Sequence, residues 1–174
     1  DGCLMINGML VSNMSRDVGF QFLRMGMALE QSDMTTRIID VRSGSLFASR
    51  HAEDLRPFQA IQWMSVLKSL TAYQMYRRHV RIRVSGPSVL RFLLQDRFFP
   101  RSVLFSLWSI QQTLPRLPNH RSVERALERT TAIVRDADID GLMDEESDAG
   151  IGDLMDEIQI SLGELHGAIA NAFF

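Results

Sequence analysis

At 174 residues with 45% hydrophobic side chains, the chain is long enough for one domain with a sizeable core, and nothing suggests two. No apolar run reaches the roughly 18 residues that a membrane span needs, and the single cysteine, Cys3, excludes an internal disulfide. We therefore expect a soluble cytoplasmic protein with no membrane partner. Because the chain begins with Asp1 and has no charged-then-apolar leader, we expect a fragment of a longer protein without a secretion signal.

The formal net charge of −2 conceals two regions of opposite sign. Residues 1–129 carry 18 basic and 10 acidic side chains, a net +8, whereas residues 130–174 carry 1 basic and 11 acidic side chains, a net −10. The two regions should attract each other. Every basic residue except Lys68 is an arginine, which suits forked contacts to carboxylate or phosphate, although genome base composition can enrich arginine as well.

Apolar residues recur at helical spacing along the chain, without the two-residue alternation or hairpin turns of strands. Ser15 is the expected N-cap of the first long helix, and Pro57, Pro87 and Pro100 fall where prolines open helices. The sequence thus predicts an all-α fold, a single helical bundle of about five to seven helices with the second and third of them long. In chain order, the expected helices span about 2–12, 16–47, 57–83, 86–95, 100–115, 120–137 and 153–172.

Side chains of both charge signs share one face of the expected helix over 16–47. At about 100° per residue they fall within about 80° of arc, and we call them the charged stripe: Gly26, Glu30, Asp33, Arg37 and Asp40. In a functional interpretation the stripe belongs to a polar interior pocket or a partner contact, and its glycine lets another helix approach closely. The alternative is a solvated face with helical ion pairs. We expect Arg37 to be a buried structural partner, so that alanine there should lower the melting temperature.

Aromatic and arginine side chains gather between residues 73 and 83. Tyr73 and Arg77 share a helical face, Tyr76 lies beside them, and further arginines follow to Arg83. Such a surface could bind phosphate or single-stranded nucleic acid. We favour the alternative, in which the tyrosines face the core and the arginines bond acidic side chains. Nucleic acid is not an expected partner, because the chain is mildly acidic overall.

Arg101 and Ser102 fall in the first turn of the helix expected to begin at Pro100. Free backbone N–H groups there favour an anion, so this turn is a candidate anion site. Arginine at a helix N-terminus opposes the helix dipole, which suggests a specific acidic partner. The candidate partners for the arginine are Glu30, Asp33, Asp40 and Asp96.

Known catalytic and cofactor motifs are missing from the sequence. No serine, histidine and carboxylate pattern fixes a triad, and no phosphate loop, dinucleotide fingerprint or zinc motif occurs. A cluster of acidic residues could attract a divalent cation, but its spacing is not that of an EF-hand, so a solvated loop is expected at Asp144, Glu145, Glu146, Asp148 and Asp153. We therefore expect no cofactor and no metal, name no catalytic residue, and favour a domain that is not an enzyme by itself.

Three sequence segments resemble those of a known family: LEQSDMTTRIIDV at 29–41, QWMSVLKSLTAYQMYRR at 62–78 and FPRSV at 99–103. In order and approximate spacing they resemble the bacterial alpha-E family, a predicted helical domain with a Glu-Arg motif. The resemblance covers nearly the whole chain and places the motif at Glu30-Gln31, so Gln31 stands where the family has arginine. Because family members are generally longer at the N-terminus, the chain resembles the latter portion of such a domain.

The resemblance also implies a partner. Alpha-E proteins are encoded beside, or fused to, circularly permuted ATP-grasp proteins, an association that suggests formation of peptide or amide bonds. We therefore expect an accessory, interaction or substrate-presenting domain for an ATP-grasp carboxylate–amine ligase, and leave open whether it forms a homo-oligomer. One alternative is an arginine-rich nucleic-acid module. The other is an enzyme or anion site inside the bundle, which requires convergence of Glu30, Arg37, Tyr73, Tyr76, Arg77 and Arg101.

Overall fold

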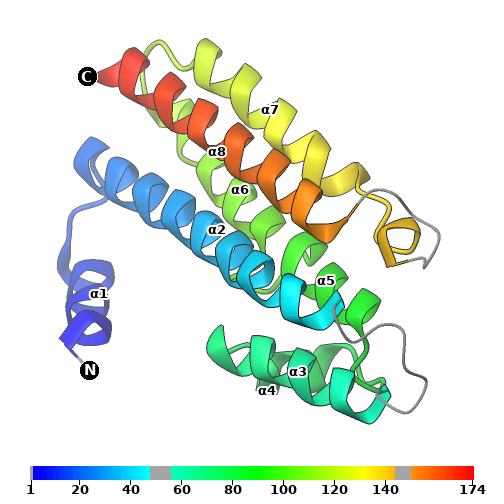
Figure 1. The fold of residues 1–174 in the computed structure, drawn as a ribbon. Helices are drawn as coiled ribbons and strands as arrows, with labels where there is room; N and C mark the ends of the chain where they lie inside the picture. Colours follow the sequence, from blue (N-terminus) through cyan, green and yellow to red (C-terminus); the bar gives the residue numbers. More distant parts are fainter. Residues whose placement is uncertain (1, 48–55, 144–149) are drawn as a thin grey trace.

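A computed structural model describes residues 2–47, 56–143 and 150–174, and all regular structure in these ranges is helical (Figure 1). The predicted all-α fold is confirmed. The eight α-helices of the described ranges are α1 (Gly2–Asn13), α2 (Val18–Phe47), α3 (Arg56–Ser69), α4 (Tyr73–His79), α5 (Gly86–Gln95), α6 (Val103–Gln111), α7 (Arg121–Asp136) and α8 (Ile151–Phe173). Short 3₁₀ turns, η2 (Leu114–Arg116) and η3 (Gly141–Met143), precede and follow α7. The two long helices are α2 and α8, with 30 and 23 residues.

Four helices form an antiparallel four-helix bundle, in which each helix is antiparallel to its two neighbours. α2 packs against α6 and α8, and α7 packs against the same two helices (Figure 1). The rings of Phe22, near the start of α2, and Phe173, at the end of α8, lie 5.2 Å apart between centroids, as antiparallel packing requires. α5 and α3 cover one end of this four-helix bundle, because α5 contacts α6, α7 and α3 while α3 contacts α2.

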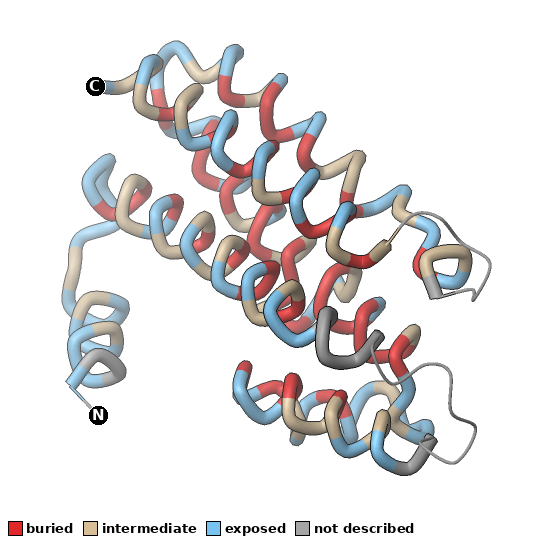
Figure 2. The backbone as a smooth tube through the Cα atoms, viewed as in Figure 1, coloured by how far each residue is buried: buried red, intermediate tan, exposed pale blue. Residues whose placement is uncertain are grey.

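The apolar faces of these helices meet in one core. Figure 2 shows the buried positions on the inner sides of the bundle helices. In α6, for example, Val103, Leu107 and Ile110 recur at helical spacing and are each at most 1% exposed. α1 differs from the bundle helices, because all of its described side chains are exposed or half-buried.

The predicted single helix over 57–83 is wrong, because the chain turns between α3 and α4. Thr71 has a φ of 53°, a left-handed conformation that β-branched residues rarely adopt. The N–H of Ala72 donates to the carbonyl oxygen of Leu67 at 2.7 Å, which is the pattern of a Schellman-type helix end. Leu70 and Ala72 both enter the core on the two sides of this turn. The apolar spacing continues across the turn, so the sequence pattern did not mark it.

The start of α2 also differs from the prediction. The helix begins at Val18, because Asp17 rather than Ser15 caps it. The Asp17 carboxylate accepts the N–H of Phe20 at 3.1 Å, and its negative charge lies at the positive end of the helix dipole.

The expected attraction between the basic and acidic regions is present as ion pairs at the surface. Arg91 on α5 pairs with Asp140, and Arg129 on α7 pairs with Glu164 on α8 at 2.7 Å. Each of these four side chains is at least 46% exposed, so solvent and salt screen the pairs. They connect the two regions without contributing to the core.

Gln95, the last residue of α5, caps the end of α7. Its side-chain nitrogen donates to the carbonyl oxygens of Val134 at 3.1 Å and Ala137 at 3.0 Å. Because the last carbonyls of a helix have no partner within it, Gln95→Ala is expected to lower the free energy of unfolding by about 1–2 kcal/mol. Urea denaturation checks this, with Gln74→Ala on the exposed side of α4 as the control. Equal losses in both variants would contradict the capping role.

Candidate functional site

The charged stripe of α2 lies at the surface of the bundle. Glu30 and Arg37 are exposed, and Asp33 and Asp40 are half-buried. The Arg37 Nε donates to Asp33 Oδ2 at 2.6 Å, and the Arg37 side chain is 60% exposed. This hydrogen bond, and then the charge of Asp33, raise the pKa of Arg37 above its usual value. The prediction that Arg37 is a buried partner is therefore wrong.

The packed face of α2 is the opposite one. Thr35 lies about 200° around the helix from Asp33 and from Arg37, at about 100° per residue. Its hydroxyl donates to the backbone carbonyl oxygen of Arg101 at 3.0 Å. On the stripe itself, no atom of the described residues lies within 4 Å of where a Cβ on Gly26 would be, so the predicted close approach of another helix is wrong. Between Glu30 and Arg37 the stripe is a solvated helix face.

Arg37→Ala is expected to leave the melting temperature close to that of the wild type, because an exposed ion pair within one helix contributes little to stability. Thermal unfolding followed by circular dichroism checks this. Val41→Ala, at a 77% exposed position of the same helix, gives the change to expect from an exposed site. A much larger fall for Arg37→Ala than for Val41→Ala would reinstate the structural role.

Tyr76 belongs to the hydrophobic core. It is fully buried, its hydroxyl lies 2.6 Å from that of Ser88, and its ring meets Phe92 edge-on with 5.5 Å between centroids. Tyr73 is half-buried, and the Arg77 guanidinium carbon lies 6.0 Å from the centroid of its ring. The favoured interpretation is thus confirmed for Tyr76, whereas in the described ranges no ion pair joins Arg77 to a carboxylate.

The arginines that follow this tyrosine group stay at the surface. Arg78, Arg81 and Arg83 are exposed, and the Arg81 side chain donates to the carbonyl oxygen of Arg78 at 3.3 Å. Binding of DNA or RNA to this surface, the alternative that the sequence did not favour, stays untested.

Ser102 is a helix cap. α6 begins at Val103, three residues after Pro100, so Arg101 and Ser102 do not lie in its first turn as predicted. The Ser102 hydroxyl accepts the N–H of Phe105 at 3.1 Å and donates to the carbonyl oxygen of Asp96. Because Ser102 is fully buried and both hydrogen bonds are internal, its hydroxyl stabilises the start of α6.

Within the described ranges, the nine predicted site residues are not brought together in either of the two pockets described below. Arg101 is half-buried, and among the described residues no ion pair joins it to Asp96 or to the acidic side chains of the stripe. The others lie on α2, on α4 and at the start of α6, and none lines either of the two pockets described below. The anion site built from these side chains therefore lacks the convergence that it requires. A binding role for any one of them stays a prediction.

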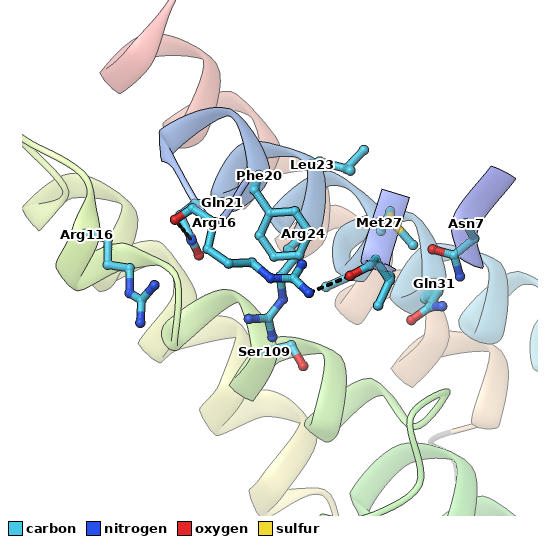
Figure 3. A pocket seen from close by; sticks show the side chains of 12 residues that line it. Asn7, Arg16, Phe20, Gln21, Leu23, Arg24, Met27, Gln31, Ser109 and Arg116 are labelled. Carbon is cyan, nitrogen blue, oxygen red and sulfur yellow. Dashed lines mark hydrogen bonds between the residues drawn. The ribbon is translucent and has the colours of Figure 1, made fainter. Parts of the chain in front are cut away.

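The structure has a different pocket, between α1, α2, α6 and η2 (Figure 3). Its volume is about 560 Å³. Every charged residue in its lining is an arginine, and we call it the arginine pocket after Arg16, Arg24 and Arg116. The other polar side chains of the lining are Asn7, Gln21, Gln31 and Ser109.

Arg16 is held in place along one side of the arginine pocket. Its guanidinium carbon lies 4.0 Å from the centroid of the Phe20 ring, and a terminal N–H donates to the carbonyl oxygen of Val11. The Gln21 amide donates to the backbone carbonyl oxygen of Arg16 at 3.4 Å. The stacking and the hydrogen bond to Val11 fix the guanidinium, and its remaining N–H groups are available to a ligand.

Arg24 and Arg116 are exposed and come from different elements. Figure 3 shows Arg24 reaching from α2 towards Ser109 on α6, with Arg116 on the neighbouring η2 turn. No ion pair within the described ranges neutralises either of them or Arg16. Because like charges in one pocket repel each other and guanidinium groups form strong hydrogen bonds with oxyanions, the pocket favours a carboxylate or a phosphate.

The other end of the arginine pocket is polar and uncharged. Asn7 and Gln31 line it, and both are half-buried (Figure 3). The side-chain oxygen of Asn7 is buried, with no hydrogen-bond partner in the described part of the chain. A buried acceptor without a partner costs free energy, so a ligand with an N–H or O–H group near its anionic group would fit.

No pattern in the sequence predicted this pocket. Its arginines are spread over about a hundred residues of chain, and only folding brings them together. The available signal was on α2, where Arg24, Ala28 and Gln31 are spaced four and three apart and so share a face. Gln31 had been singled out only as a departure from the family motif.

The described residues form neither a metal site nor a membrane span. Within 2–47, 56–143 and 150–174, no three His, Cys, Asp or Glu side chains are close enough together to hold a metal ion. Of the predicted acidic loop, residues 144–148 lie outside the described residues, whereas Asp153 lies in the first turn of α8. None of the helices in the described ranges combines the length and apolar character needed to cross a bilayer.

The family model Alpha-E, described as a predicted alpha-helical domain with a conserved ER motif, matches residues 1–174. The chain belongs to the Alpha-E family. The resemblance that the three sequence segments indicated is thereby confirmed over the whole chain. No curated protein and no solved structure matches this Alpha-E chain.

The position predicted for the Glu-Arg motif lies at the edge of the arginine pocket. In this Alpha-E chain Glu30 is exposed, and its neighbour Gln31 lines the pocket. An arginine at that position would bring a fourth guanidinium to the lining. If the motif is placed as predicted, Gln31 stands in for its arginine at a position that sets the charge of a pocket.

Proposed function

We propose that this Alpha-E chain is an accessory helical domain that holds an anionic substrate or product for a partner ATP-grasp carboxylate–amine ligase. The observation that carries the proposal is the arginine pocket, in which Arg16, Arg24 and Arg116 supply all of the charge. The partner comes from the association with ATP-grasp proteins that the family resemblance implies.

The chemistry of such a ligase fits the pocket. An ATP-grasp ligase activates a carboxylate as an acyl phosphate and joins it to an amine, so its substrates carry oxyanions and N–H groups. Guanidinium forks bind either a carboxylate or a phosphate. The unpartnered amide oxygen of Asn7 can accept an amine or amide N–H from the same ligand. A molecule with a carboxylate next to an amide is therefore the preferred occupant.

The role as a ligase partner is tested by co-purification and by activity. We expect the chain to form a complex with the ATP-grasp protein encoded beside it, and the ligase rate to fall when the domain is deleted. The double variant Arg24→Ala, Arg116→Ala should keep the complex but lower the rate, whereas Arg78→Ala, on the exposed side of α4, should change neither. No complex, together with an unchanged rate after deletion, would count against the proposal.

Tri-glutamate, a peptide that carries carboxylates next to amides, serves as the probe ligand. Gln31→Arg is expected to tighten its binding several-fold, because the substitution adds a guanidinium to a pocket that already favours negative charge. Isothermal titration calorimetry at low salt measures the affinity. Gln74→Arg makes the same change of charge at an exposed position of α4, outside the pocket. If both variants gain equally, the effect is the overall charge of the protein and not the pocket.

A further inference from the structure

The turn between α5 and α6 directs one phenylalanine inward and holds the other in solvent. The Asp96 carboxylate accepts the N–H of Phe98 at 2.8 Å and that of Phe99 at 2.7 Å, which fixes the backbone. Phe99 is 6% exposed and stacks on Phe92 with 4.6 Å between ring centroids. Phe98 is 80% exposed, so a large apolar ring is kept at the surface by a well-ordered turn.

Phe98 forms one wall of a second pocket, which has a volume of about 510 Å³ and lies across α6 and α7. We call it the aromatic groove, and it shares no lining residue with the arginine pocket. Phe105 and Trp108 line it with 5.5 Å between their ring centroids, and Trp108 is 49% exposed. Leu104 extends the apolar surface.

The charge in the lining of the aromatic groove is positive. Among the described residues, Arg97 and Arg135 are the charged residues of its lining, and no Asp or Glu lines it. In the described part of the chain no ion pair engages Arg97. Arg135 forms a bidentate salt bridge with Asp136, in which each hydrogen bond measures 2.8 Å. Both side chains are more than half exposed. Arg97 is therefore the guanidinium more available to a ligand.

We propose that the aromatic groove binds a short segment of a partner protein in which an aromatic or leucine side chain lies next to carboxylates. Exposed aromatic and arginine side chains supply most of the binding energy at protein interfaces. The fixed Phe98 turn lowers the ordering cost of binding, and the positive charge of Arg97 complements an acidic segment. This inference is independent of the arginine pocket and of the ligase.

The test uses the intrinsic fluorescence of Trp108. The chain has two tryptophans, and the other, Trp63, is only 4% exposed, so a ligand in the groove should change the emission of Trp108. The probe is the hexapeptide EELFEE, blocked at both ends, titrated at low salt. We expect saturable binding that is at least tenfold tighter than that of EEAAEE, which lacks the anchor, or KKLFKK, which reverses the charge.

Variants assign the binding to the groove. Phe98→Ala and Arg97→Ala should each weaken EELFEE binding at least tenfold, whereas Arg78→Ala, at an exposed position of α4 outside both pockets, should leave it unchanged. Equal affinity for the three peptides, or full affinity in Phe98→Ala, would overturn the proposal. Equally tight binding of free phenylacetate would make the groove a small-molecule site. If analytical ultracentrifugation shows a dimer that Phe98→Ala abolishes, the groove is an interface between copies of the chain. Both of these results would contradict the binding of a partner peptide.

Discussion

Phe92→Ala is expected to lower the free energy of unfolding by about 3–5 kcal/mol, the usual cost of truncating a fully packed aromatic side chain. Phe92 is 3% exposed, meets Tyr76 edge-on and stacks on Phe99. It thus joins α4, α5 and the turn before α6. Its removal leaves a cavity at the point where three segments meet, and the neighbouring backbone elements limit how far that cavity can collapse.

Urea denaturation followed by circular dichroism measures this loss. Phe58→Ala is the matched control, because it deletes the same side chain at a 49% exposed position of α3. We expect the control to lose far less stability than Phe92→Ala. Similar losses for the two variants would show that the aromatic cluster is not a packed part of the core.

Arg24→Glu is expected to weaken the binding of tri-glutamate at least tenfold, which corresponds to about 1.4 kcal/mol. The substitution removes one guanidinium from the arginine pocket and puts a carboxylate in its place, so a bound anion meets repulsion where it had a donor. The fold should be unaffected, because Arg24 is exposed and forms no ion pair within the described ranges.

Calorimetric titration at low and at physiological salt measures the affinity, and the loss should be smaller at higher salt. Arg78→Glu changes the net charge by the same amount at an exposed position of α4 and should leave the affinity close to that of the wild type. If Arg78→Glu weakens binding as much as Arg24→Glu does, the anion is held by the general field of the protein and the arginine pocket has no special role.

Helical periodicity was enough to predict the fold class and most of the helices. The burial of Val103, Leu107 and Ile110 follows directly from their spacing on α6. Periodicity did not predict the turn at Thr71, because the apolar spacing continues across it while the backbone takes a left-handed conformation there. Such a turn depends on the core that Leu70 and Ala72 enter, and that core is built from residues distant in sequence.

The candidate site was less predictable than the fold. Opposite charges on one helix face suggested a buried network, but the spacing that brings Asp33 and Arg37 together is satisfied equally well in solvent. Tyr76 was correctly favoured as a core residue, since its position follows the apolar face of α4. The arginine pocket required long-range information, because Arg16, Arg24 and Arg116 meet only when α2 lies against α6 and η2.

The most direct test of the arginine pocket is an NMR titration of the chain with tri-glutamate at low salt, followed through the arginine side-chain N–H signals. We predict saturable shifts at Arg16, Arg24 and Arg116, with the Arg78 signal and the Trp108 indole signal unchanged. Shifts confined to the exposed arginines of residues 77–83, or no saturable shift at any arginine, would contradict the assignment of an anion site to this pocket.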